Sequence, residues 1–256
     1  MNWLKVYWGR VALVMLVVLV SFIWHLPANW VWQQSGLKKQ FPSDLSLSAI
    51  KGVWWQGQTT IHWQDKTVGR IDWQWQPSHL FKGALTVDLK LSAPQNQLSM
   101  QAALTLDSLR LDSISGSVKM AKLADIPALA LLDQAQGEVV LKTLSLSLPR
   151  ESLQGQQPWP SEVSGQVALV DFSAMGMHLP LVEATPSLDE NGLTLSVNGK
   201  GKGWQLSGQT WLSPKRIFAH DLTLTADAPA SMPDWVGLMM RQTQPTTAVL
   251  KARGRW

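Results

Sequence analysis

The segment from Val11 to Trp24 limits the arrangement of this chain more than any other. It reads VALVMLVVLVSFIW, and among its apolar side chains only Ser21 is polar. Extended to residues 6–26, the run reaches about 20 residues, the length of helix that crosses a hydrocarbon core of roughly 30 Å. The pattern therefore predicts a single transmembrane helix over residues 11–26.

The residues that flank this run favour one orientation of the helix. Arg10 and Trp8 precede it, Trp24 ends it and Pro27 follows it, so a basic side chain and two tryptophans would lie at the headgroup level. Basic residues concentrate on the cytoplasmic side of membrane spans. We therefore expect residues 1–10 to be cytoplasmic, residues 27–43 to form a juxtamembrane segment, and the rest of the chain to be exported.

A cleaved signal peptide is the alternative interpretation, because it also combines a basic start with an apolar centre. Cleavage requires small residues just before the cut, and the residues available here are Leu26 and Ala28 around Pro27. That match is poor, so the sequence favours a retained membrane anchor.

Composition and motifs exclude several kinds of site. The chain has no cysteine, and its 22 basic and 18 acidic residues are spread along it, without the basic stripe of a nucleic-acid-binding protein. There is no serine in a nucleophile elbow and no close pair of histidines with metal-ligand spacing. The five histidines lie far apart, at His25, His62, His79, His178 and His220. We expect no enzyme activity, no metal and no cofactor.

From residue 44 onward, apolar and polar residues alternate with a period of two, which is typical of half-buried β-strands. The alternation changes parity at Asp107-Ser108, at Asp112-Ser113 and at Lys142-Thr143. A change of parity turns side chains to the other face, so each demands a β-bulge or a tight turn. We predict a mainly β periplasmic domain over residues 44–256, a bent and twisted antiparallel sheet with one or two short helices, at residues 123–136 and 233–241.

Tryptophans are concentrated at the start of this domain. Of the 15 in the chain, five lie at Trp54, Trp55, Trp63, Trp73 and Trp75. One interpretation is that these rings fill the core, since they alternate with polar residues. The other is that they cover an apolar groove or meet a partner. The alternation favours the core.

Three short motifs resemble the protein N family of the bacterial type II secretion system. They are Leu26-Pro27-Ala28 after the apolar run, the turn Gly52-Val53-Trp54-Trp55-Gln56-Gly57, and Trp73-Gln74-Trp75-Gln76-Pro77 with Leu80 and Gly83. The residues that carry the resemblance most directly are Gly52, Trp54, Trp55, Gly57, Trp73, Trp75 and Pro77. The turn differs from the family pattern in having two adjacent tryptophans.

The resemblance implies a non-catalytic accessory component of the inner-membrane platform of the secretion machine, with other secretion subunits as its partners. Similar turns also occur in AsmA-like envelope proteins. That second likeness implies a different function, a periplasmic module that binds or transfers lipid along the apolar face of a bent sheet. Whether residues such as Leu85, Val87 and Leu89 are covered by protein would discriminate between the two.

Overall fold

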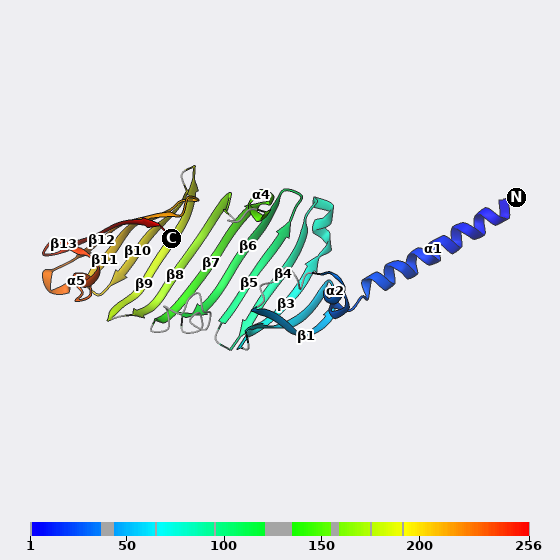
Figure 1. Cartoon of the computed structure of the whole chain (residues 1–256), viewed down its shortest axis with the longest axis horizontal. Coiled ribbons are helices and arrows are strands. Elements are labelled where there is room, and N and C mark those ends of the chain that lie inside the picture. The colour runs from blue at the N-terminus through cyan, green and yellow to red at the C-terminus, as the bar shows by residue number, and fades with distance from the viewer. Residues whose placement is uncertain are drawn as a thin grey trace. The chain divides into compact units, whose positions relative to one another are not determined.

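The structure is a computed structural model, and it describes residues 2–36, 44–64, 66–94, 96–120, 135–154, 159–174, 176–190 and 192–255 (Figure 1). The chain forms two compact units. The first comprises Met1–Trp75 and Val87–Ala93, and the second comprises Gln76–Thr86 and Pro94–Trp256.

The first unit combines two helices with a small antiparallel sheet. Its elements are α1 (Asn2–Trp24), α2 (Ala28–Gln34), β1 (Leu45–Val53), β2 (Gln56–Trp63), β3 (Lys66–Gln76) and most of β4 (Leu85–Ala93). The strands lie in chain order, and β1 pairs with β2 and β2 with β3 in antiparallel fashion. Gly36 follows α2 and has φ +67°. A glycine in this left-handed conformation commonly ends a helix.

The helix predicted over the apolar run is present, and α1 continues it to Asn2. Its large apolar side chains from Val11 to Ile23 are between 44% and 69% exposed. Within the part of the chain that the structure describes, no helix is both long enough and apolar enough to cross a membrane. The helical part of the prediction is therefore confirmed, and the spanning part is not.

The second unit is an antiparallel meander whose strands run side by side in chain order from β5 to β12 (Figure 1). Beyond β12, the last two strands are exchanged, so that β14 pairs with β12 and β13 lies at the edge. Its strands are β5 (Asn96–Leu104), β6 (Ser108–Lys119), β7 (Gln136–Pro149), β8 (Glu162–Ala174), β9 (Met177–Asp189), β10 (Gly192–Gly201), β11 (Trp204–Leu212), β12 (Ile217–Ala226), β13 (Arg241–Gln244) and β14 (Thr247–Arg255). The prediction of a mainly β, twisted antiparallel sheet is confirmed.

Helices are few and short in the described part of this unit. They are the 3-10 helices η2 (Pro77–Lys82) and η4 (Pro229–Ser231) and the α-helices α4 (Arg150–Gln154) and α5 (Val236–Met239). The helix predicted at residues 233–241 is thus shorter than expected, because Met240 is already extended and β13 begins at Arg241. The helix predicted at residues 123–136 lies almost entirely outside the described residues.

The changes of parity in the sequence correspond to irregularities in the strands, as predicted. Thr105 to Ser108 form the turn between β5 and β6, with Thr105 N–H donating to the Ser108 carbonyl over 2.9 Å. Ser113 has φ 54° where the β6–β7 register shifts, and Thr143 has φ 49° where the β7–β8 register shifts. Ser113 and Thr143 are therefore bulges. After each bulge, the apolar side chains return to the face that carries the apolar side chains before it.

The buried core of the second unit lies at its C-terminal end. The segment around α5 covers the last strands there, and Trp235 and Val236 pack with Leu224 and Ala248 in one cluster. Trp204 meets Trp235 edge to face, with ring centroids 6.0 Å apart. Apolar side chains from an irregular segment thus close one end of the sheet's apolar face.

Candidate functional site

The site with the most specific geometry is the turn between β1 and β2, made by Trp54 and Trp55. Two glycines allow it to form. Gly52 has φ +97°, and a Cβ there would lie 2.5 Å from the Gln56 carbonyl oxygen. A Cβ on Gly57 would lie 2.5 Å from Cζ2 of Trp73, so the absence of a side chain leaves room for that ring. The glycine spacing of the motif is therefore a requirement of backbone and ring packing.

The two indoles of this turn bind the C-terminal end of α1. Trp54 Nε1–H donates to the Ile23 carbonyl over 2.7 Å, and Trp55 Nε1–H donates to the Trp24 carbonyl over 2.9 Å. The backbone N–H of Trp54 also donates to the Leu26 carbonyl over 3.2 Å. The last carbonyls of a helix lack partners within the helix. The turn supplies those partners and so fixes the end of α1 against the first unit's sheet.

Ring contacts reinforce these hydrogen bonds. The rings of Trp24 and Trp55 lie 5.1 Å apart between centroids, and those of Trp54 and Trp75 also lie 5.1 Å apart, both pairs tilted. Trp73 Nε1–H donates to the Trp54 carbonyl over 3.2 Å, and Trp75 N–H donates to the Trp55 carbonyl over 2.7 Å. Strand β3 thus also holds the turn. We call Trp24, Trp54, Trp55, Trp73 and Trp75 the tryptophan clamp.

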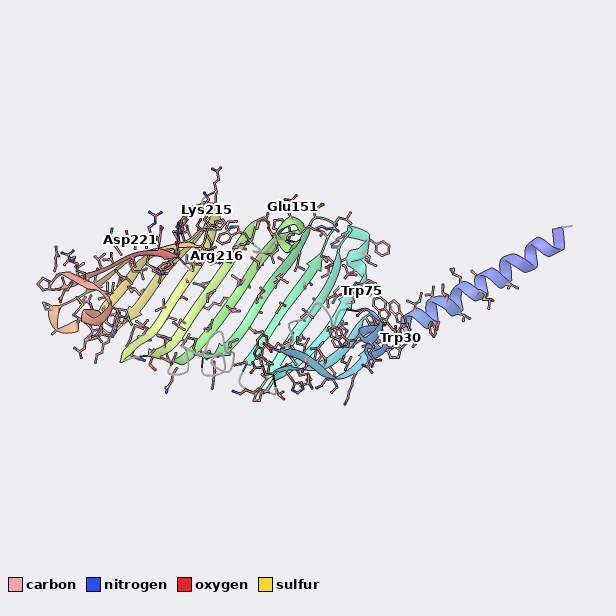
Figure 2. All side chains as sticks on the ribbon, in the orientation of Figure 1. Trp30, Trp75, Glu151, Lys215, Arg216 and Asp221 are labelled. Atoms are coloured by element: carbon pink, nitrogen blue, oxygen red, sulfur yellow. The ribbon has the colours of Figure 1, made fainter. Side chains whose placement is uncertain are left out.

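Two indole N–H groups, one in the clamp and one outside it, are buried without an acceptor. They belong to Trp63 and Trp75 (Trp75 is labelled in Figure 2). Among the described residues, these two are the buried side-chain nitrogen or oxygen atoms that lack a hydrogen-bond partner. An unpaired buried donor costs about 1–3 kcal/mol. Of the clamp rings, Trp24 is 41% exposed and the other four are half-buried. The core interpretation of the tryptophans stays a prediction.

The structure brings together most, but not all, of the residues singled out in the sequence. Gly52, Gly57 and the clamp tryptophans lie together in the first unit, and Pro27 bridges Val53 there. Pro77 is the first residue of η2 and belongs to the second unit. Trp8 and Arg10 lie in α1, but their side chains are outside the described residues, so their predicted place at a membrane interface stays a prediction.

Sequence reasoning missed the acceptors of the clamp. They are the backbone carbonyls of Ile23, Trp24 and Leu26, which carry no signal in residue identity. The available signal was indirect: an apolar helix needs partners for its last carbonyls, and the motif offered two indole donors.

A second polar cluster on the same sheet has a serine and a histidine in contact, but the hydrogen-bond partners of that histidine within the described residues include no carboxylate. Ser48 Oγ lies 2.6 Å from His62 Nε2, and Thr67 Oγ1 lies 3.2 Å from His62 Nδ1. A catalytic triad has a carboxylate where Thr67 stands, to hold the imidazole tautomer and stabilise its charge. Both hydrogen bonds are exposed to solvent. Among the described residues, no group of three His, Asp or Glu side chains could hold a metal ion.

Fold and site together define a class, that of β-meander proteins whose N-terminal helix is held to the sheet by a tryptophan turn. Residues 43–246 match the family model described as type II secretion system (T2SS), protein N. The chain belongs to the type II secretion system protein N family. The family resemblance drawn from the short motifs is thereby confirmed.

One curated relative is a type II secretion system protein N of Vibrio cholerae serotype O1. It is 33% identical over 75 residues, which make up 29% of this chain and 28% of the relative. The matched part of the chain thus spans little more than a quarter of the relative's length. No solved structure matches the chain.

Proposed function

We propose that this chain is a non-catalytic accessory subunit of the inner-membrane platform of the bacterial type II secretion system, where it supports export of folded proteins across the outer membrane. The observation that carries the proposal is the family match over residues 43–246, which includes almost the whole sheet-forming part of the chain. The other secretion subunits are its partners in this proposal.

Residues 11–26 anchor the chain in the inner membrane, with residues 1–10 in the cytoplasm, residues 27–43 next to the membrane and residues 44–256 in the periplasm. Two features support this arrangement. The apolar side chains of α1 are exposed in the chain taken by itself, so they require an apolar cover. The carbonyls at the end of α1 have indole donors, which matters most where water is scarce.

The edge of β1 is the partner surface that this proposal favours. One edge of β1 pairs with β2. At its other edge, the β-bridge found among the described residues joins Pro27 to Val53. An unpaired strand edge presents N–H and C=O groups that can bind a strand of another chain. The clamp holds this edge at a fixed place relative to the end of α1.

Photo-crosslinking in cells tests the partner surface. A photoreactive amino acid replaces Lys51, which is exposed on the edge strand β1, and as a matched control Gln74, which is exposed on β3 between β2 and β4. We expect adducts to inner-membrane secretion subunits from position 51 and far fewer from position 74. Failure to recover any secretion subunit, by crosslinking or by gentle detergent co-purification, would refute the proposal.

Cysteine labelling tests the anchor. Because the chain has no cysteine, only an introduced cysteine can be labelled. In spheroplasts, a membrane-impermeant maleimide should label Gln74→Cys, on the exposed face of β3, and should label Asn2→Cys only after the inner membrane is permeabilised. Equal labelling of both variants before permeabilisation, or release of the chain from membranes by alkaline carbonate, would contradict the anchored orientation.

A further inference from the structure

The last strands of the second unit leave part of a sheet edge without a strand partner. β13 pairs only with the first part of β14, and the pair of Arg241 with Val249 is the furthest along β14. On its other side, β14 pairs with β12 as far as Arg255. Within the described residues, no strand pairs with Lys251–Arg255 on the side of β13. We call Lys251–Arg255 the open edge.

The backbone of the open edge has hydrogen-bonding groups that the sheet does not use. Along an antiparallel strand, N–H and C=O groups point alternately to one side and to the other, so those that do not point to β12 point outward. Among the described residues, no hydrogen bond from another backbone segment reaches them. Outward groups of this kind bind an extended peptide as an added strand. β13 already pairs with the beginning of the same edge in this way.

The basic side chains of the open edge lie on one face of the strand. Lys251, Arg253 and Arg255 alternate with Ala252 and Gly254, and successive side chains of a strand point to opposite faces. All three basic side chains are exposed. The open edge therefore presents a row of positive charges on one face and small residues on the other.

One of these three charges has a partner within the sheet, and two do not. Lys251 Nζ lies 2.9 Å from Oδ2 of Asp221, the residue opposite it on β12. The residues opposite Arg253 and Arg255 on β12 are apolar. Within the described part of the chain, neither guanidinium forms an ion pair. Two exposed arginines two residues apart thus stay available to an anionic partner.

Further positive charge lies at both ends of the open edge. Ile217 of β12 pairs with Arg255, and the turn just before Ile217 carries the exposed side chains of Lys215 and Arg216 (both labelled in Figure 2). At the other end, Arg241 of β13 lies opposite a residue of the basic face and therefore on that same face. Positive charge thus accompanies the open edge over its whole length.

The charge pattern selects among the strands that the open edge can bind. Opposite charges on directly opposed residues of two strands are stabilising, and like charges are destabilising. The same edge of a second copy would place basic side chains opposite basic side chains, so self-association is disfavoured. A strand with a carboxylate at every second residue would place these carboxylates opposite Arg253 and Arg255. An anionic surface without a peptide backbone would leave the outward N–H and C=O groups unused.

We infer that the open edge binds an extended acidic segment of another protein as an added β-strand, with carboxylates opposite Arg253 and Arg255. At about 3.4 Å per residue, the open edge extends over roughly 17 Å, which is the length of a typical strand. The inference rests on the second unit alone. It depends neither on the membrane anchor nor on the edge of β1, so either proposal can fail without the other.

Peptide binding to the purified full-length chain in detergent tests the inference. The probe is a fluorescent peptide in which glutamate alternates with valine and threonine. Its control has the same glutamates but carries proline at two of the intervening positions, which keeps the charge and removes two backbone N–H groups. By fluorescence anisotropy, we expect the control to bind at least about fivefold more weakly, since two hydrogen bonds are lost. Hydrogen exchange should show that the bound probe protects amides of Lys251–Arg255.

A pair of double variants tests the role of the charges. In Arg253→Gln/Arg255→Gln, each lost pair of opposite charges weakens binding roughly two- to threefold, so we expect a combined loss of about fivefold. Lys200→Gln/Lys202→Gln is the matched control, because it removes two exposed basic residues at the same spacing from the β10–β11 hairpin. Binding to this control should be unchanged. All four side chains are exposed, so neither variant removes a core contact.

Four results would overturn the inference. They are the absence of binding by the acidic probe, equal binding of the proline peptide, an equal loss in the two double variants, and protection of β1 in place of β14. Equal binding of the proline peptide would identify the arginines as a general anion-binding surface. Protection of β1 would place the probe on the other edge of the sheet.

Discussion

The indole nitrogen of Trp54 lies 2.7 Å from the backbone carbonyl oxygen of Ile23, a residue 31 positions earlier in the chain. Trp55 makes the equivalent bond to Trp24, the next residue of the helix. A two-residue β-turn thereby serves as the C-terminal cap of α1. The turn is also held by β3, so the helix end and the first three strands form one hydrogen-bonded structure.

Replacing Trp54 with phenylalanine should loosen the end of α1 without removing the ring. The change deletes one donor, and a hydrogen bond of this kind contributes about 0.5–1.5 kcal/mol. We expect faster amide exchange in residues 21–27, by about fivefold for a loss of roughly 1 kcal/mol. Hydrogen exchange measured by mass spectrometry provides the readout.

Trp30→Phe is the control for that experiment, because Trp30 is an exposed tryptophan of α2 outside the clamp (Figure 2). Exchange in residues 21–27 should be unchanged in this variant. Equal exchange in Trp54→Phe and in the natural chain would mean that the indole bond does not hold the helix end.

Gly57→Ala should destabilise the first unit, although it adds only one methyl group. The new methyl group would lie 2.5 Å from Cζ2 of Trp73 and also close to the backbone of β1, and overpacking of this kind costs about 1–3 kcal/mol. Gly237→Ala is the matched control, since a Cβ there meets nothing within 4 Å and alanine favours its helix. Urea unfolding followed by tryptophan fluorescence should show a loss for the first variant and none for the second.

The fold was largely predictable because it is local. Alternation with a period of two identifies strands, and each change of parity predicted an irregularity, which Ser113 and Thr143 confirm. Helix length was less predictable, since α5 ends at Met239 where the pattern continued to residue 241. A short apolar segment gains its stability from tertiary packing, which the periodicity of its own residues does not contain.

The site was predictable only in part. The motif residues Gly52, Trp54, Trp55, Gly57, Trp73 and Trp75 were found from the sequence, and all of them lie in the first unit. They lie together with Trp24, which the sequence marked only as a membrane-interface residue. Their acceptors on Ile23 and Trp24 were not found, because backbone carbonyls look the same at every residue. Pro77 was included through the family resemblance of the segment from Trp73 to Pro77, whereas it begins a helix of the second unit.

Thr143→Gly should stabilise the second unit. Thr143 has φ 49°, and a left-handed conformation costs a residue with a side chain roughly 1–2 kcal/mol. Glycine removes that cost but loses about 0.5–1 kcal/mol of conformational entropy, so a net gain of up to about 1 kcal/mol remains. Lys142→Gly, at an exposed neighbour outside the left-handed region, should destabilise instead. A lower urea midpoint for Thr143→Gly than for the natural chain would contradict the bulge assignment.

Leu224→Ala should open the covered end of the apolar face. Leu224 is 0% exposed and packs under the segment that carries Trp235 and Val236, and truncation of a buried leucine costs about 2–5 kcal/mol. Leu238 lies on α5 but is 81% exposed, so Leu238→Ala should change stability by no more than about 0.5 kcal/mol. Hydrogen exchange of the β11 and β12 peptides reports the difference directly. Protection of these strands in Leu224→Ala equal to that in Leu238→Ala would show that the α5 segment does not close the sheet.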